Sequence, residues 1–166
     1  MIYRLSLSLL LLTQAAAPRA AQVRVMSPIT TKLAGAIKRK EPGWRYTPGV
    51  CTCPPLARSQ VSHDVGSWER KDEEGNREFV DIDIYKIAIT EEAVEYMNDI
   101  GRGRHGTRCQ LGGYELGDGG YVFKCPSSFK SVIYYRQGDF IVQVSGDSQD
   151  ITERFARYAL AGLPAS

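Results

Sequence analysis

The sequence predicts an α+β domain in which three helices pack on an antiparallel sheet of about five strands. Stretches with apolar residues at helical spacing and short runs rich in β-branched and aromatic residues follow one another along the chain. Their order is helix, two strands, helix, three strands, helix, and tight turns join successive strands. This order favours a meandering sheet covered by helices.

The first helix is predicted to begin at Ser27-Pro28, because Ser is a good N-cap and Pro suits the first helical position. It is predicted to end at Pro42-Gly43. The apolar residues at helical spacing are Ile29, Leu33 and Ile37. The segment 46–58 has three prolines and little periodicity, which predicts an irregular surface loop.

A β-hairpin is predicted from 65–71 and 77–89 around the polar turn 72–76. Apolar and polar side chains alternate in its second arm, which indicates one buried and one solvated face. The residues that alternate are Val80, Ile82 and Ile84 with Asp81, Asp83 and Tyr85. A helix over 90–100 then follows, with Thr90 as the expected N-cap.

The Gly-rich segment 101–120 is predicted to be a long exposed loop with a short strand around 110–115. The next three strands are expected at 121–124, 130–136 and 139–145. Asp150 and Glu153 match a capping box and predict the last helix.

The first 21 residues have the layout of a secretory signal peptide, which is a short basic start, an apolar run and a segment of small residues. The apolar run is about half the ~20 residues that a membrane span needs. We therefore expect a removable signal peptide at 1–21, a single α+β domain at 22–166, no membrane span in the mature chain, and a periplasmic or secreted location.

The charge of the chain is nearly balanced, with 21 basic and 19 acidic side chains. This balance gives no strong attraction to nucleic acid or anionic lipid. No nucleic-acid partner is therefore expected.

Four cysteines accompany the predicted export, and an even number in an oxidising compartment is typical of disulfides. Cys51 and Cys53 are too close in sequence to pair well with each other in extended backbone. Each is therefore expected to pair with one of Cys109 and Cys125, which leaves two connectivities open. Two disulfides would then link the N-terminal half to the C-terminal sheet.

The C-terminal part carries a family resemblance. Gly117-Asp118 stands before a strand, Arg136-Gln137-Gly138-Asp139 stands before the next, and Arg154-Phe155-Ala156-Arg157 lies in the last helix. In these features residues 107–163 resemble secreted bacterial α+β domains of uncharacterised function. The resemblance implies an envelope domain that binds rather than catalyses, and it assigns no functional residue.

The principal functional prediction is an exported, non-catalytic binding or sensing domain, and not an enzyme. Arginines and a histidine gather in the Gly-rich loop, where they are suited to an anionic ligand or an acidic protein surface. The candidate ligand-binding residues are Arg102, Arg104, His105, Arg108 and Tyr114. The partner expected is an envelope protein, a peptide or a small ligand.

Two other functions remain open from the sequence. Asp81, Asp83 and His63 would serve a small secreted hydrolase if they converged in one pocket. The segment 142–146 is similar to the hairpin motif of cystatin-type protease inhibitors. No metal site or cofactor is predicted, because the Cys spacing lacks paired Cys-x-x-Cys knuckles and no calcium-loop pattern is present.

Overall fold

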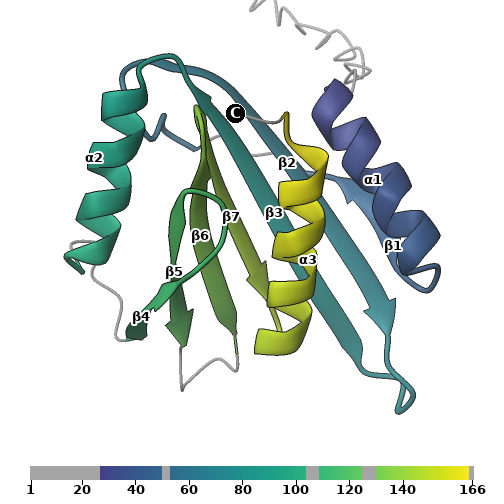
Figure 1. The fold of residues 1–166 in the computed structure, drawn as a ribbon. Coiled ribbons are helices and arrows are strands. Elements are labelled where there is room, and N and C mark those ends of the chain that lie inside the picture. Colours follow the sequence, from purple (N-terminus) through teal and green to yellow (C-terminus); the bar gives the residue numbers. More distant parts are fainter. Residues whose placement is uncertain (1–26, 50–52, 104–108, 125–129, 165–166) are drawn as a thin grey trace, which may run out of the picture.

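In a computed structural model of the chain, a seven-stranded antiparallel sheet carries three helices (Figure 1). The structure describes residues 27–49, 53–103, 109–124 and 130–164. The strands lie in the order β1-β2-β3-β7-β6-β5-β4. The helices are α1 (Pro28–Lys40), α2 (Thr90–Gly101) and α3 (Gln149–Gly162). The strands are β1 (Arg45–Pro48), β2 (Gln60–Lys71), β3 (Arg77–Ile87), β4 (Gln110–Tyr114), β5 (Gly119–Lys124), β6 (Ser131–Gln137) and β7 (Phe140–Gly146).

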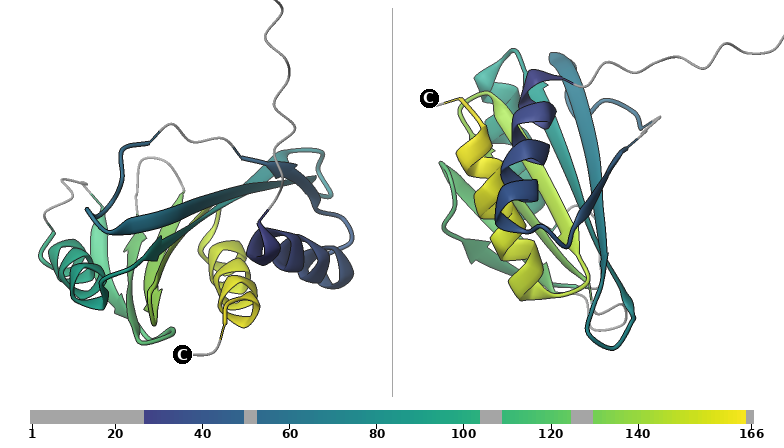
Figure 2. Two further views of the ribbon diagram at one scale, coloured as in Figure 1. Left: turned by 90° about the horizontal axis from the view of Figure 1, so that it is seen from above. Right: turned by 90° about the vertical axis from the view of Figure 1, so that its right-hand side faces the viewer.

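The helices lie on opposite faces of the sheet (Figure 2). Alternate residues of a strand point to opposite faces, so β3 contributes to two separate cores. Val80, Ile82 and Ile84 pack with α1 and α3. Tyr85 and Ile87 pack with α2. The α2 helix therefore covers one face and the other two helices cover the reverse face.

Three aromatic rings form the centre of the larger core. Phe155 of α3 is fully buried, and its ring centroid lies 4.8 Å from that of Trp44 and 6.0 Å from that of Trp68. Both pairs have edge-to-face geometry, which aromatic quadrupoles favour. The contacts join α3 to the loop after α1 and to β2.

One of the three predicted helix N-caps is confirmed and two are wrong. The Ser27 cap is confirmed, because its hydroxyl oxygen accepts a hydrogen bond from the Thr30 N–H at 3.2 Å. Thr90 is instead the first residue of α2, and its hydroxyl donates to Asp139 Oδ1 at 2.8 Å. The last helix is capped by Ser148, two residues before the predicted Asp150.

The prediction of five strands is wrong, because the sheet has seven. One additional strand, β1, lies in the segment predicted to be irregular, and it pairs with β2 from Arg45↔Glu69 to Pro48↔Gly66. The other is β4, which was expected only as a short strand within a loop. Pairing with a neighbouring strand overrides the weak local propensity of these segments.

The predicted cross-linking by two disulfides also needs correction, since no two described cysteines form a bridge. Cys51 and Cys125 lie outside the described residues. Neither Cys53 nor Cys109 is a free thiol. In the described structure the β3–β7 ladder, which runs from Val80↔Gly146 to Lys86↔Phe140, joins the N-terminal half to the rest together with the Phe155 contacts.

Within the described residues, none of the helices has the length and apolar character required to cross a bilayer.

Replacing Phe155 with Ala should lower the free energy of unfolding by about 3–5 kcal/mol, because it removes a fully buried ring and leaves a cavity between two tryptophans. Urea denaturation followed by tryptophan fluorescence measures this loss. Phe79→Ala is the matched control, since Phe79 is 40% exposed. Equal losses for the two variants would contradict the assignment of this core.

Candidate functional site

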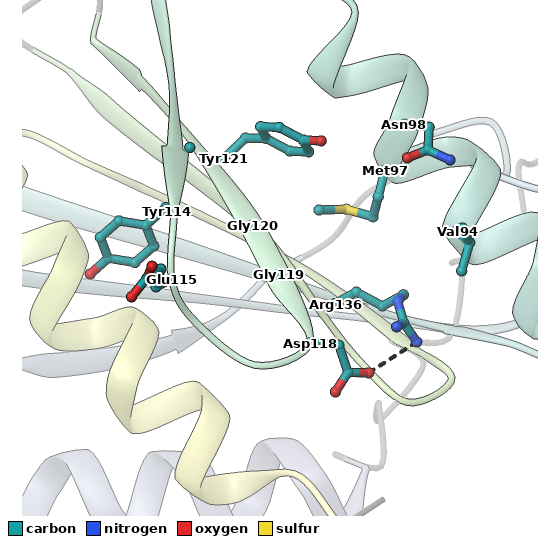
Figure 3. Close-up of a pocket in the computed structure, with 11 residues that line it drawn as sticks. Val94, Met97, Asn98, Tyr114, Glu115, Asp118, Gly119, Gly120, Tyr121 and Arg136 are labelled. Carbon is teal, nitrogen blue, oxygen red and sulfur yellow. Dashed lines mark ion pairs between the residues drawn. The ribbon is translucent and has the colours of Figure 1, made fainter.

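An open groove of about 530 Å³ lies between α2 and the hairpin formed by β4 and β5 (Figure 3). Residues from α2, from this hairpin and from β6 line it. They are Val94, Met97, Asn98, Gly113, Tyr114, Glu115, Asp118, Gly119, Gly120, Tyr121 and Arg136. The groove thus combines apolar walls with a small number of charged and polar groups.

The helical wall consists of residues at positions i, i+3 and i+4, which share one face of a helix. Met97 is 6% exposed and belongs to the core beneath α2. Val94 is 38% exposed and stands at the opening. Asn98 is also exposed and adds an amide beside it. This wall therefore changes from apolar at its base to polar at its rim.

The strand wall is formed mainly by Tyr121, whose ring extends from β5 toward α2 (Figure 3). A Cβ added at Gly101 would lie 2.3 Å from the Tyr121 hydroxyl, so a side chain at this end of α2 would displace the Tyr121 ring. Opposite Tyr121 in the β4–β5 register is Gly113. Nothing lies within 4 Å of the position that a Gly113 Cβ would take, so the sheet surface is open there.

A polar clasp between two turns fixes the floor of the groove. Asp118 Oδ2 accepts a hydrogen bond from the Gly138 N–H at 2.8 Å and lies 3.0 Å from Arg136 Nη1. Arg136 Nη1 also donates to the Gly138 carbonyl at 3.0 Å. The Asp118 N–H donates to the Arg136 carbonyl at 2.8 Å. These bonds hold the β4–β5 turn against the β6–β7 turn.

Close approach of β6 constrains two glycines, one in the β4–β5 turn and one in β5. Gly117 has φ +60°, and a Cβ there would lie 2.3 Å from the Arg136 carbonyl oxygen. At Gly120 a Cβ would lie 2.6 Å from the Tyr134 carbonyl oxygen. A side chain at Gly117 would force the two turns apart, and one at Gly120 would push β5 away from β6.

The structure brings the predicted cationic cluster together only in part. Arg104, His105 and Arg108 lie outside the described residues. Arg102 follows the end of α2, and its side chain is 61% exposed and 3.5 Å from Asp99. Tyr114 is among the groove residues, but its ring points toward α3 and away from Tyr121 (Figure 3). Burial, followed by the nearby Glu153 carboxylate, raises the pKa of Tyr114.

Sequence reasoning did not find the groove itself. Met97 falls in the predicted helix 90–100 and Tyr121 in the predicted strand 121–124, and neither was among the candidate ligand-binding residues. Asp118 and Arg136 belong to the two short motifs that carry the family resemblance, and the clasp shows that these motifs meet in space. Their proximity depends on the pairing of β5 with β6, which no local pattern specifies.

The residues of the hydrolase hypothesis converge only in part. His63 Nε2 lies 2.8 Å from Asp83 Oδ1, and the His63 ring stacks on Tyr85 with centroids 4.1 Å apart. Asp81 instead accepts a hydrogen bond from the Ser67 hydroxyl. None of these three residues lines the groove. His63 and Asp83 therefore meet, while Asp81 has a separate partner.

The His63–Asp83 pair is largely withdrawn from water, with side-chain exposures of 12% and 16%. Burial, with a smaller effect from Asp81, raises the pKa of Asp83 above its ordinary value of 3.8, although His63 acts in the opposite direction. Burial also raises the pKa of Tyr85 strongly.

The segment resembling the protease-inhibitor motif lies in β7, between β3 and β6. Val142 and Val144 are fully buried. An inhibitor motif of this kind must be exposed at a hairpin tip, so the resemblance does not extend to the structure.

The described residues contain no group of three or more His, Cys, Asp or Glu side chains suited to hold a metal ion.

Replacing Asp118 with Ala should release the clasp and cost about 1–3 kcal/mol, because the Gly138 N–H and Arg136 lose a charged acceptor. Amide hydrogen exchange at Gly138 should become faster. Glu115→Ala removes a neighbouring exposed carboxylate and serves as the control. Unchanged exchange at Gly138 in the Asp118 variant would contradict the clasp.

The raised pKa of Asp83 predicts a pH dependence of stability. A carboxyl whose pKa is higher in the folded than in the unfolded state contributes stability below its unfolded pKa, and this contribution is lost as the pH rises through its folded pKa. The stability of the wild type relative to Asp83→Asn should therefore fall as the pH rises above about 3.9. Urea denaturation of both proteins across this range measures the difference. A rise in relative stability would show that the attraction to His63 outweighs burial.

No protein-family model matches the chain, and no curated protein matches it. Among solved structures, the chain is similar to a GTP binding regulator from Thermotoga maritima, with a TM-score of 0.40 and 17% sequence identity. The match covers 82% of this chain and 90% of that chain. A likeness at this level carries no argument about function.

Proposed function

We propose that this protein is a non-catalytic binding domain whose ligand occupies the groove between α2 and the β4–β5 hairpin. The observation that carries the proposal is the Asp118–Arg136 clasp beneath two apolar walls. This ion pair fixes the floor of the groove and does not involve the residues of the two walls. A largely formed concavity with few, well-placed polar groups is typical of ligand sites.

The size and surface of the groove favour a compact, uncharged ligand group. Its volume of about 530 Å³ falls in the range of small-ligand pockets. Met97, Val94 and Tyr121 supply apolar surface on both sides. Arg136 and Asp118 neutralise each other, and Glu115 adds one exposed carboxylate to the lining, so the groove has little attraction for a free anion.

The polar groups of the groove favour binding over catalysis. Among the described residues, no His or Cys lines the groove. The Asp118 carboxylate already accepts a backbone N–H and lies against a guanidinium group, so it is poorly suited to take a proton from a substrate. The buried His63–Asp83 pair belongs to β2 and β3, outside the groove.

We also propose that the domain acts outside the cytoplasm, in the periplasm or the medium. The support is the signal-peptide pattern of the first 21 residues.

The proposal is tested by NMR on protein labelled with ¹³C at methionine methyl groups, because Met97 lies in the groove. The probe is a set of small neutral amides that includes N-acetyl-leucinamide. Binding compounds should shift the Met97 methyl signal. Val94→Glu should weaken binding about tenfold or more by placing a charge at the opening, since tenfold corresponds to only ~1.4 kcal/mol.

Val61→Glu is the matched control, since Val61 is 63% exposed and does not line the groove. It should bind the same compounds with unchanged affinity. If no compound shifts the Met97 signal, or if both variants lose binding equally, the groove is not the ligand site.

A further inference from the structure

The sheet ends in two edge strands, and they differ in how they are protected. The edge strand β1 has only four residues, which include Arg45 and Pro48. Charged residues and proline on a short strand are common means of preventing another strand from pairing. The opposite edge, β4, has the sequence Gln-Leu-Gly-Gly-Tyr, with neither charge nor proline. Only β4 therefore offers an unprotected edge among the described strands.

Among the described strands, β4 pairs on one side only, with β5. Alternate residues of an edge strand direct their N–H and C=O groups away from the sheet, where they remain unpaired. Leu111, at 36% exposure, is also one of the exposed large apolar side chains. This edge thus combines free backbone hydrogen-bonding groups with apolar surface.

The edge is continuous with the groove, because Gly113 and Tyr114 belong to both. In the register of the hairpin, Leu111 lies opposite Phe123 and Gly113 opposite Tyr121. Phe123 and Tyr121 pack on the face that α2 covers, so Leu111 and Gly113 share that face. A side chain from an added strand, placed beside Gly113, would find open space against the Tyr121 ring.

We propose that an extended peptide segment of a partner protein pairs with β4 as an eighth strand and inserts one apolar side chain beside Gly113, between Tyr121 and Met97. This deepens the proposed function and rests on it. An extended peptide is favoured over a small molecule because a row of alternating backbone donors and acceptors is matched best by another strand. The apolar side chain follows from the apolar surface that Val94, Met97 and Tyr121 give to the groove.

The probe is a synthetic library of octapeptides with acetylated and amidated ends and an apolar residue at varied positions. The tightest binder is then remade with N-methyl groups at one backbone amide at a time. Methylation of alternate amides should weaken binding by about fivefold to tenfold each, because each of those amides donates to β4. Methylation of the intervening amides should change the affinity by less than about twofold. A uniform pattern would overturn strand addition.

Two glycine variants provide a matched pair. Gly113→Val should weaken the peptide about tenfold or more, because its side chain fills the space intended for the ligand. Gly112→Ala is the control, since its Cβ would make an ordinary contact of 3.5 Å with Val122, which packs with α3 on the opposite face. Unfolding measurements check that both variants remain folded. Equal affinities would overturn the placement, and the N-methyl pattern tests the pairing without any variant.

The outcomes also separate this inference from the proposed function. If small amides shift Met97 while the N-methyl pattern is uniform, the groove binds ligands and strand addition fails. If neither amides nor peptides reach the groove, the proposed function fails as well. If light scattering shows a dimer that Leu111→Lys converts to a monomer, the partner of β4 is a second copy of this chain, and the peptide proposal is overturned.

Discussion

The pairing of β3 with β7 is the interaction on which the rest of the structure depends. It joins the N-terminal elements to the C-terminal meander through an antiparallel ladder of seven residue pairs. Val80, Ile82, Val142 and Val144 along it are almost fully buried. Because both strands contribute to both cores, a slip of one residue would move apolar side chains to the wrong face throughout the sheet. The register is thereby fixed by packing on two sides.

The distribution of the helices over this sheet produces the candidate site. Three helices do not cover both faces of seven strands, and α2 reaches only part of its face (Figure 2). Beyond α2, strands β4 and β5 form one side of the groove and the unpaired edge of the sheet. In this region the Asp118–Arg136 clasp holds the β4–β5 turn against the β6–β7 turn. The candidate binding surface thus results from the incomplete cover of the sheet by helices, together with the turns that the clasp joins.

Local patterns in the sequence predicted much of the fold. Ser27-Pro28 marked a helix start, and Asp72 to Asn76 marked a turn in which Gly75 has φ +86°. Strand β1 was missed and β4 was underestimated. Pro48 lies in β1 and a Gly-Gly pair lies in β4, so each is a strand only because a neighbouring strand pairs with it. Residues far apart in sequence form the groove, so it depends on the strand order, which local periodicity does not specify.

The candidate site was predicted less well for the same reason. The Gly-rich segment 101–120 was predicted as the recognition surface, and residues 113–115 and 118–120 of it line the groove, but the emphasis on its arginines missed Arg136, which follows from the pairing of β5 with β6. The central claim, that the β4 edge is open, is tested most directly by amide hydrogen exchange of the free protein, measured residue by residue by NMR. Alternate β4 amides should exchange far faster than those of β3 and β7. If every β4 amide were protected as strongly as its β5 neighbours, the edge would already be covered and the account would be contradicted.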